Sequence, residues 1–240
     1  MKFSLVIPMY NEKSIIADTA KTLSAYMSEH FDDYEILFSN DGSKDGCDEI
    51  VRELNLPNVR VTGYPVNQGK GCAVRTAVLE AEGDIVMFTD ADLAYGTDVI
   101  ARVAETFEAN PDADMIIGSR NLSSDGYEGY TLMRKLASKT YIKVLCIAGG
   151  FKLSDSQCGC KAFRGEAAKK IFSRCEVNGF AFDFEAILWS QRYGCKIVEM
   201  PVKIINHRES KVHVISDTFK MLRDLRKMKK RIKKIEIEIK

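Results

Sequence analysis

The first half of this chain alternates short apolar runs with amphipathic segments, and that alternation is the strongest constraint on its fold. Runs suited to strands occupy residues 3–8, 35–40, 59–64, 85–89 and 115–119. Between them, residues 14–29, 47–54, 71–81 and 98–109 carry apolar residues at helical spacings, with Thr97 as the expected N-cap of the last helix. We therefore expect an α/β fold with a Rossmann-like, mostly parallel sheet flanked by helices.

The second half has a less regular pattern. Residues 121–129 are polar and contain glycine, which is typical of a loop. Beyond it we predict helices at 132–148, 165–172 and 184–193, and strands at 159–163 and 196–202. A last helix is expected at 214–234, where nine Lys or Arg between Lys220 and Lys234 accompany an apolar stripe of Ile215, Phe219, Leu222, Leu225 and Met228.

Asp90-Ala91-Asp92 directly follows the apolar run at 85–89, so it is expected at the carboxyl end of a buried strand. Open α/β sheets bind their ligands at that edge. Two such carboxylates can share a divalent cation, and Mg²⁺ usually takes one or two carboxylates together with phosphate oxygens. A second triplet, Asp112-Ala113-Asp114, precedes its strand and is interpreted as a solvated turn. The first triplet thus indicates a metal and diphosphate site.

Two other loops should reach the same edge. Pro8-Met9-Tyr10-Asn11-Glu12 ends the first predicted strand, and Asn40-Asp41-Gly42-Ser43 ends the second. An aromatic ring can stack on a nucleobase, and a carboxylate such as Asp41 can accept the imino N–H of uracil or guanine. Taken alone, Asp41-Gly42-Ser43 is explained equally well as a simple turn. The convergence of these loops at one edge favours a nucleotide site.

Asn67-Gln68-Gly69-Lys70-Gly71 opens a predicted helix, where backbone N–H groups and Lys70 can meet a phosphate. Its spacing differs from that of a Walker A loop. Glycines that ease a loop into a helix are an equally good explanation, so both interpretations stay open.

Composition argues against several classes of protein. The net charge of +1 gives no reason to expect nucleic acid binding. The seven Cys form neither a disulfide framework nor a C-x-x-C zinc pattern, and the three His form no ligand cluster. We find neither a signal peptide nor an apolar run of about 20 residues, and expect a cytoplasmic protein that does not itself span a membrane.

Eight motifs follow one another along the chain: Val6-Ile7-Pro8-Met9-Tyr10-Asn11-Glu12, Asn40-Asp41-Gly42-Ser43, Asn67-Gln68-Gly69-Lys70-Gly71, Phe88-Thr89-Asp90-Ala91-Asp92-Leu93, Gly118-Ser119-Arg120, Asp155-Ser156-Gln157-Cys158-Gly159-Cys160-Lys161, Phe182-Asp183-Phe184-Glu185 and Ser210-Lys211-Val212. In this order they resemble the motifs of family 2 glycosyltransferases. Within that family they are similar to the polyprenyl-phosphate branch, which includes dolichyl-phosphate β-glucosyltransferases and mannosyltransferases.

The resemblance covers the chain to about Val214. It implies a GT-A fold, a nucleotide-sugar donor, Mg²⁺ or Mn²⁺, and inversion at the anomeric carbon. It also implies a catalytic domain at 1–213, with a nucleotide-binding half at 1–120 and an acceptor half at 121–213, followed by a basic amphipathic helix and tail at 214–240.

The resemblance further implies roles for individual residues. Asp92 would be the main metal ligand and Asp90 the weaker one. The donor would lie among Pro8, Tyr10, Asn11, Glu12, Ser39, Asp41, Lys70, Asp90, Ala91, Arg120, Arg208 and Lys211. Catalytic or acceptor-side roles would fall to Asp92, Arg120, Asp155, Asp183 and Glu185. Two positions depart from the family pattern: Asn40 replaces the first Asp of Asp-Asp-Gly-Ser, and Ala94 stands where mannosyltransferases have a Gln near the metal.

The acceptor decides whether a general base is needed. For a sugar hydroxyl, Asp183 or Glu185 would be the base, although Glu185 can equally be an acid that complements a helix N-terminus. A lipid phosphate with a second pKa of about 6 is largely dianionic at neutral pH, and it would leave Asp155, Asp183 and Glu185 as acceptor-side or structural groups.

We expect an inverting enzyme that transfers glucose from UDP-glucose to a dolichyl or undecaprenyl phosphate. The alternatives are transfer of mannose from GDP-mannose, a saccharide or cell-wall acceptor, and a non-catalytic sugar-nucleotide-binding module. The basic helix at 214–234 is expected to lie on the cytosolic face of an anionic membrane, with simple packing on the domain as the alternative. A separate small membrane subunit is a further expected partner.

Overall fold

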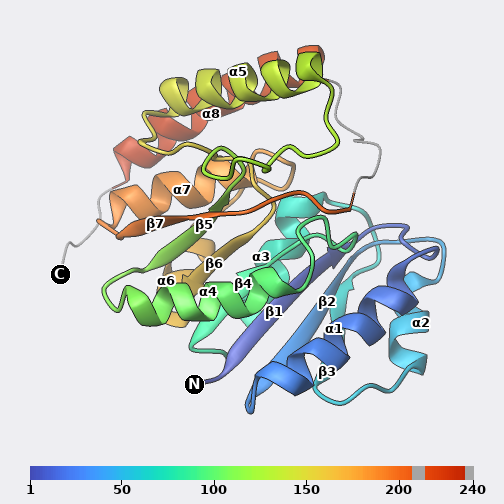
Figure 1. The fold of residues 1–240 in the computed structure, drawn as a ribbon. Helices are drawn as coiled ribbons and strands as arrows, with labels where there is room; N and C mark the ends of the chain where they lie inside the picture. Colours follow the sequence, from blue (N-terminus) through green and yellow to red (C-terminus); the bar gives the residue numbers. More distant parts are fainter. Residues whose placement is uncertain (207–213, 236–240) are drawn as a thin grey trace.

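The computed structural model describes residues 1–206 and 214–235, and its first half has the expected alternation of strands and helices (Figure 1). The strands are β1 (Phe3–Met9), β2 (Tyr34–Asp41), β3 (Val59–Tyr64), β4 (Ile85–Phe88) and β5 (Met115–Ser119). The helices are α1 (Ile16–His30), α2 (Cys47–Glu53), α3 (Lys70–Glu80) and α4 (Asp98–Ala109). Thr97 does precede α4, but its side chain forms no capping hydrogen bond within the described residues.

The second half adds two strands and four helices to the same body. They are α5 (Leu132–Gly149), β6 (Lys161–Arg164), α6 (Gly165–Phe172), α7 (Phe182–Arg192), β7 (Ile197–Pro201) and α8 (Val214–Lys234). Predicted boundaries differ from these by about two residues at most, as at the starts of β6 and α7.

The strands form one seven-stranded sheet in the order β3-β2-β1-β4-β6-β5-β7. Strand β6 runs antiparallel to β4 and β5, and the other paired strands run parallel. The expected mostly parallel sheet flanked by helices is therefore confirmed. Because β6 enters between β4 and β5, the second half of the chain completes the sheet that the first half begins.

Alternate side chains of each strand enter two cores on opposite faces of the sheet, as the two-residue period of a strand requires. In β1, Leu5 and Ile7 pack with α1, α2 and α4, whereas Val6 packs with the core on the other face. That second core contains side chains of α3, α5, α6, α7 and α8. Helices α5 and α8 form an outer layer beyond α7 (Figure 1).

Helix α8 uses its apolar side chains for packing within the molecule. Met221, Leu225, Met228 and Ile232 are buried in the core. The side chains of Ile215 and Phe219, which belong to the predicted stripe, lie outside the described part of the structure. The described stripe thus faces the protein, as in the packing alternative. Among the described residues, no helix combines the length and apolar content needed to cross a bilayer.

Candidate functional site

One edge of the sheet collects the chain segments that carry most of the predicted site. Met9 pairs with Asn40, Asp41 with Tyr64, and Val6 with Phe88, so β1, β2, β3 and β4 end together. Since β6 is antiparallel, its first residue, Lys161, pairs with Phe88 at the same edge. The topology therefore places the Cys158-Gly159-Cys160 turn beside the triplet that follows β4.

The Asp90-Ala91-Asp92 triplet forms a tight turn. Leu93 has a φ of 49°, an uncommon value for a bulky residue, and its N–H donates to Asp90 O at 3.1 Å. Ala91 is buried, and its carbonyl accepts the Thr19 hydroxyl at 2.8 Å. Asp92 Oδ1 accepts the Ala94 N–H at 3.1 Å. These contacts tie down the backbone while both carboxylates keep partial exposure to solvent.

Asp90 is held from two sides. Lys70, at the start of α3, forms an ion pair with its Oδ1. On the other side, Gly159 lies so close that a Cβ atom at this position would displace Asp90 Oδ2. Burial by itself lowers the pKa of Lys70, but Asp90 and Asp183 outweigh it and raise that pKa above its ordinary value. Lys70 is consequently a fixed cation beside the triplet.

A second ion pair lies beneath this edge. The fully buried Lys161 donates from Nζ to Asp183 Oδ1 at 2.7 Å and to Cys158 O at 2.6 Å. Burial raises the pKa of Asp183, and the nearby Lys161 and Lys70 limit the rise. Sequence reasoning did not name Lys161 as a site residue, although a lysine inside the apolar pattern of a strand was a usable signal.

Arg120 follows β5 and is clamped by Asp155. Arg120 Nε lies 2.6 Å from Asp155 Oδ2, and its Nη2 lies 3.0 Å from Oδ1, in bidentate geometry. Asp155 is fully buried, and its N–H donates to Glu199 of β7 at 3.2 Å. The Tyr127 ring lies 5.6 Å from the guanidinium. Glu199 and Tyr127 are thus supporting residues that sequence reasoning missed.

On the base side, Asp41 already has several donors. It is almost fully buried, and its carboxylate accepts hydrogen bonds at 2.8–3.0 Å from the Tyr64 hydroxyl, the Asn67 amide and the N–H groups of Gln68 and Gly69. Asp41 therefore holds the loop between β3 and α3. An imino N–H of a base would have to share or displace one of these donors.

The other predicted base-side residues fall into two groups. Tyr10 is exposed, and Asn11 joins two loops through hydrogen bonds with Ser43 and Lys44 at 3.0 and 2.9 Å. Pro8 and Glu12 are half-buried in the same segment. Ser39, by contrast, is fully buried and donates to Ala73 O at 2.7 Å. The Ser39 side chain thus faces the interior, and a contact of this residue with the donor stays a prediction.

Glu185 also lies apart from the exposed edge. It is fully buried in the first turn of α7, where it pairs with Arg231 of α8 and accepts the N–H groups of Glu176 and Val177 at 2.9 and 2.7 Å. These are the contacts expected from the structural alternative to a general base. Arg208 and Lys211, the predicted cationic residues near the diphosphate, lie outside the described residues.

The carboxylate oxygens at the triplet suit a divalent cation that also binds the oxygens of a diphosphate. Within the described ranges, no three His, Cys, Asp or Glu side chains cluster as a ready-made metal site. Mg²⁺ and its analogues need only one or two carboxylates when a diphosphate supplies the other oxygens. Both Asp90 and Asp92 are partly exposed at this turn, and Asp90 also pairs with Lys70. The residues present therefore fit a metal that is shared between these carboxylates and a diphosphate.

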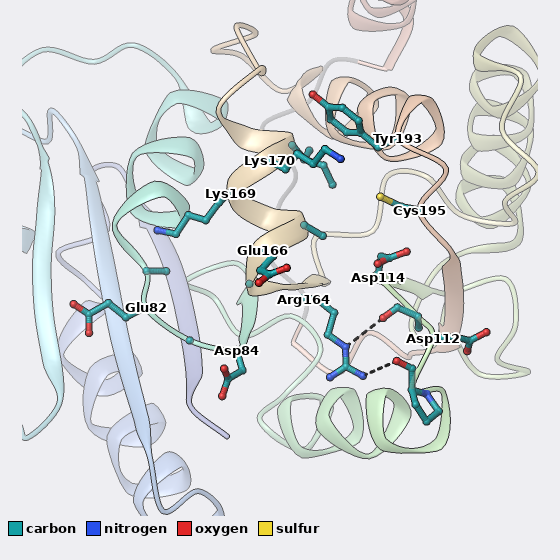
Figure 2. A pocket seen from close by; sticks show the side chains of 17 residues that line it. Glu82, Asp84, Asp112, Asp114, Arg164, Glu166, Lys169, Lys170, Tyr193 and Cys195 are labelled. Carbon is teal, nitrogen blue, oxygen red and sulfur yellow. Dashed lines mark hydrogen bonds between the residues drawn. The ribbon is translucent and has the colours of Figure 1, made fainter. Parts of the chain in front are cut away.

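A hollow of about 850 Å³ lies at the opposite, amino edge of the sheet, and Figure 2 shows the charged side chains of both signs around it. Arg164 there is directed to the carbonyl oxygens of Phe107 and Ala113, at 3.1 and 3.3 Å. These contacts join the last turn of α4 to the loop before β5 and leave this cation committed to backbone partners.

Comparison with known proteins agrees with this geometry. The family model described as glycosyl transferase family 2 matches residues 4–172. A dolichyl-phosphate beta-glucosyltransferase of Trichomonas vaginalis is 33% identical over 235 residues, covering 94% of this chain and 72% of its own length. The dolichyl-phosphate beta-glucosyltransferase of Saccharomyces cerevisiae is 29% identical over 241 residues, with 92% and 72% covered.

A solved structure shares the fold. Glucosyl-3-phosphoglycerate synthase from Mycobacterium tuberculosis, in complex with Mn²⁺, UDP and phosphoglyceric acid, superposes with a TM-score of 0.69 at 19% sequence identity. The match covers 99% of this chain and 80% of that one. Together, the matched family model, the relatives and the shared fold show that this chain is a glycosyltransferase of family 2.

Proposed function

We propose that this enzyme transfers glucose from UDP-glucose to a polyprenyl phosphate, with inversion at the anomeric carbon. The observation that carries the proposal is the pair of carboxylates, Asp90 and Asp92, beside Lys70 at the ligand-binding edge of the sheet. Support for the sugar and the acceptor comes from the dolichyl-phosphate beta-glucosyltransferases, which align with 92% or more of the chain.

In this proposal, Asp92 is the protein ligand of a divalent cation, and Asp90 is the weaker ligand. When bound, the cation would neutralise charge on the departing diphosphate. Lys70 supplies a second positive charge to the same group from the start of α3, whereas the N–H groups of Gly69, Gly71 and Cys72 there already donate to oxygens of the protein. The Mn²⁺ and UDP in the complexes of the fold relatives support a divalent metal and a uridine donor.

We assign stacking of the base to Tyr10, whose ring is exposed next to the ends of β1 and β2. Asn11 joins those two loops, and Asp41 shapes the neighbouring loop through its four donors. Asp41 therefore contributes to the base pocket chiefly by holding residues 64–69. Pro8, Glu12 and Ala91 complete this side as neighbouring residues.

The acceptor phosphate needs positioning rather than a base. An oxygen of the largely dianionic phosphate bonds to the anomeric carbon while the bond from that carbon to the diphosphate breaks, and the diphosphate leaves with the electron pair. In this proposal Arg120, which is held by Asp155, meets the acceptor or donor phosphate. Asp183 is neutralised by Lys161, and Glu185 by Arg231, so neither is assigned proton abstraction. Arg208 and Lys211 stay predictions for the same anionic groups.

The test is a transfer assay with the full chain, Mn²⁺ and one donor at a time from UDP-glucose, UDP-N-acetylglucosamine and GDP-mannose. Dolichyl and undecaprenyl phosphates are the acceptors, and dolichol and a soluble saccharide are the phosphate-free controls. We expect labelled polyprenyl-phosphate glucose from UDP-glucose alone. Preferred use of GDP-mannose, preferred transfer to the saccharide, or donor binding without turnover would overturn the proposal.

A further inference from the structure

Helix α5 belongs to the outer layer of the molecule (Figure 1). Several of its large apolar side chains are exposed. The exposed fractions of Leu132, Met133, Leu136, Val144 and Ile147 are 85%, 78%, 64%, 42% and 71%. We call these five residues the α5 face. A soluble domain seldom leaves so many large apolar groups together in water, and such patches usually mark an interaction surface.

The geometry of the helix explains why these residues share one side. Successive turns repeat every 3.6 residues, so Leu132, Leu136 and Ile147 align along the outer side, while Ile142 and Leu145 point into the core. With a rise of 1.5 Å per residue, Leu132 to Ile147 extends over about 22 Å. The inner residues of α5 therefore account for its packing on the core. The apolar residues on its outer side do not take part in that packing.

Positive charge accompanies this apolar row. The sequence of α5 contains no Asp or Glu, and Lys139 and Lys143 are exposed beside the α5 face. Lysines placed in this way can extend their charged ends past an apolar surface that is being covered. The chemistry on this side of α5 thus combines apolar contact with attraction for anions.

Helix α8 runs parallel to α5 and adds more cations to the outer layer. Tyr141 of α5 donates to Met221 Sδ at 2.8 Å, and Lys229 of α8 donates to Ala148 O at 3.1 Å, which sets the two helices in register. The exposed residues of α8 include Arg223, Arg226, Lys227, Lys229, Lys230, Lys233 and Lys234. Because the buried apolar residues of α8 face the protein, its contribution to this surface is charge.

We propose that the α5 face is the surface that enters an anionic lipid bilayer, with the cations of α5 and α8 facing the lipid headgroups. This inference rests on the proposed function, because a polyprenyl phosphate acceptor resides in a membrane. An apolar row bordered by cations matches an anionic interface, whereas a second copy would bring an equally cationic layer against it. A bilayer is therefore the occupant that the charges favour.

The proposal also relates the bilayer to the site. Residues 120–131 connect Arg120, at the end of β5, directly to Leu132, the first residue of the α5 face. Leu122 in the same connection is half exposed. Docking of the α5 face would bring this connection to the headgroup level, where the phosphate of a lipid acceptor lies.

The experiment is flotation of the full chain with vesicles of phosphatidylcholine, alone or with 30% phosphatidylglycerol. We expect the variant Leu132→Ser/Leu136→Ser/Ile147→Ser to bind anionic vesicles at least tenfold more weakly than the wild type. The matched control is Val66→Ser/Leu79→Ser, which removes two exposed apolar side chains elsewhere and should bind like the wild type. Lys139→Gln/Lys143→Gln should weaken binding to anionic vesicles and leave the weak binding to neutral ones unchanged.

Two further measurements separate this proposal from the proposed function and from misfolding. The fluorescence of the tryptophan introduced by Leu136→Trp in otherwise wild-type protein should be quenched by brominated lipid. The fluorescence of the tryptophan introduced by Val66→Trp should not be quenched. Transfer to a short, water-soluble prenyl phosphate should be within twofold of wild type in the triple Ser variant. If the wild type does not bind vesicles, or if the triple variant binds them equally well, the proposal that the α5 face enters the bilayer is wrong, even if the enzyme transfers glucose. Vesicle binding without glycosylation of any prenyl phosphate would support the face and defeat the proposed function.

A second copy of the chain is the remaining candidate for covering the α5 face. Sedimentation equilibrium should find the same mass for the wild type and the triple variant. A wild-type dimer that the triple variant dissolves, together with no vesicle binding, would show that a second copy covers the α5 face and would overturn the proposal.

Discussion

The chain contains two Asp-Ala-Asp triplets that share two local features and differ in their surroundings. In both, the central alanine, Ala91 or Ala113, is buried, and a lysine pairs with one flanking carboxylate. The first triplet follows β4 at the carboxyl edge of the sheet, beside Gly159 and near Asp183. The second precedes β5 at the amino edge, where Lys196 binds Asp112 at 2.6 Å and the Asp112 side chain is 69% exposed.

The difference between the triplets comes from topology rather than composition. At the carboxyl edge, several parallel strands and the antiparallel β6 bring loops together around the first triplet. At the amino edge, the second triplet serves to connect strands, since Asp114 accepts the N–H of Lys196 at 2.8 Å next to β7. The hollow at the amino edge is lined by the second triplet, so what distinguishes the first triplet is its position at the carboxyl edge, where the ends of several strands converge.

The largest effect that would test this comparison is expected from Asp92→Asn. Loss of the proposed metal ligand should lower kcat/KM for glucosyl transfer at least 1000-fold, or by about 4 kcal/mol of transition-state stabilisation. The measurement is the initial rate as a function of Mn²⁺ concentration, with folding checked by thermal unfolding. Full metal-dependent activity of the variant would remove the functional distinction between the triplets.

A smaller effect is expected from Lys70→Met, which removes the cation paired with Asp90. We expect a loss of kcat/KM of about 10- to 100-fold, equivalent to roughly 1.4–2.7 kcal/mol, because a fixed positive charge near the diphosphate is lost. The measurement is the steady-state rate at saturating metal, and Lys21→Met on the exposed side of α1 is the control. A rate equal to that of the control would show that Lys70 has only a structural role.

The contribution of the Lys70–Asp90 ion pair to folding stability should depend on pH in a defined direction. Although burial opposes it, Asp90 raises the folded-state pKa of Lys70 above its unfolded value of about 10.4. The stabilisation is therefore complete below about pH 10 and declines as pH rises through the folded-state pKa. Urea unfolding at increasing alkaline pH should show a steeper loss for wild type than for Lys70→Met.

The smallest effect is expected from Asp112→Asn in the second triplet. The hydrogen bond with Lys196 lowers the pKa of Asp112. The small contribution of this exposed pair to folding stability is therefore present above the unfolded-state pKa of about 3.9 and is lost as pH falls through the folded-state pKa. Glucosyl transfer at neutral pH should stay within about twofold of wild type. A large loss of transfer with unchanged folding would make the two triplets functionally equivalent.

Much of the fold could be predicted from the chain itself, because strand and helix periodicities report which side chains are buried. The bounds of β3, β5, α4, α6 and α8 match their predictions, and the carboxylates of Asp90 and Asp92 do follow a strand at the expected edge. Local spacing also separated the two triplets, since one follows its strand and the other precedes it.

Contacts between distant segments could not be predicted in the same way. The interior position of Ser39, the pairing of Glu185 with Arg231 and the burial of Lys161 against Asp183 depend on neighbours that are far away in the sequence. The sequence around Asp41 gives no sign that its carboxylate is already hydrogen-bonded. The hydrogen-bond donors come from the loop at 64–69.

The sequence by itself determined the alternating α/β pattern, the strand ends that carry carboxylates and the family motifs, because each is written in neighbouring residues. Only the tertiary structure decided that β6 inserts antiparallel beside β4, that the apolar side chains of α8 turn inward and that those of α5 turn outward. Periodicity shows that a helix has an apolar side, but packing against other elements decides whether protein covers that side.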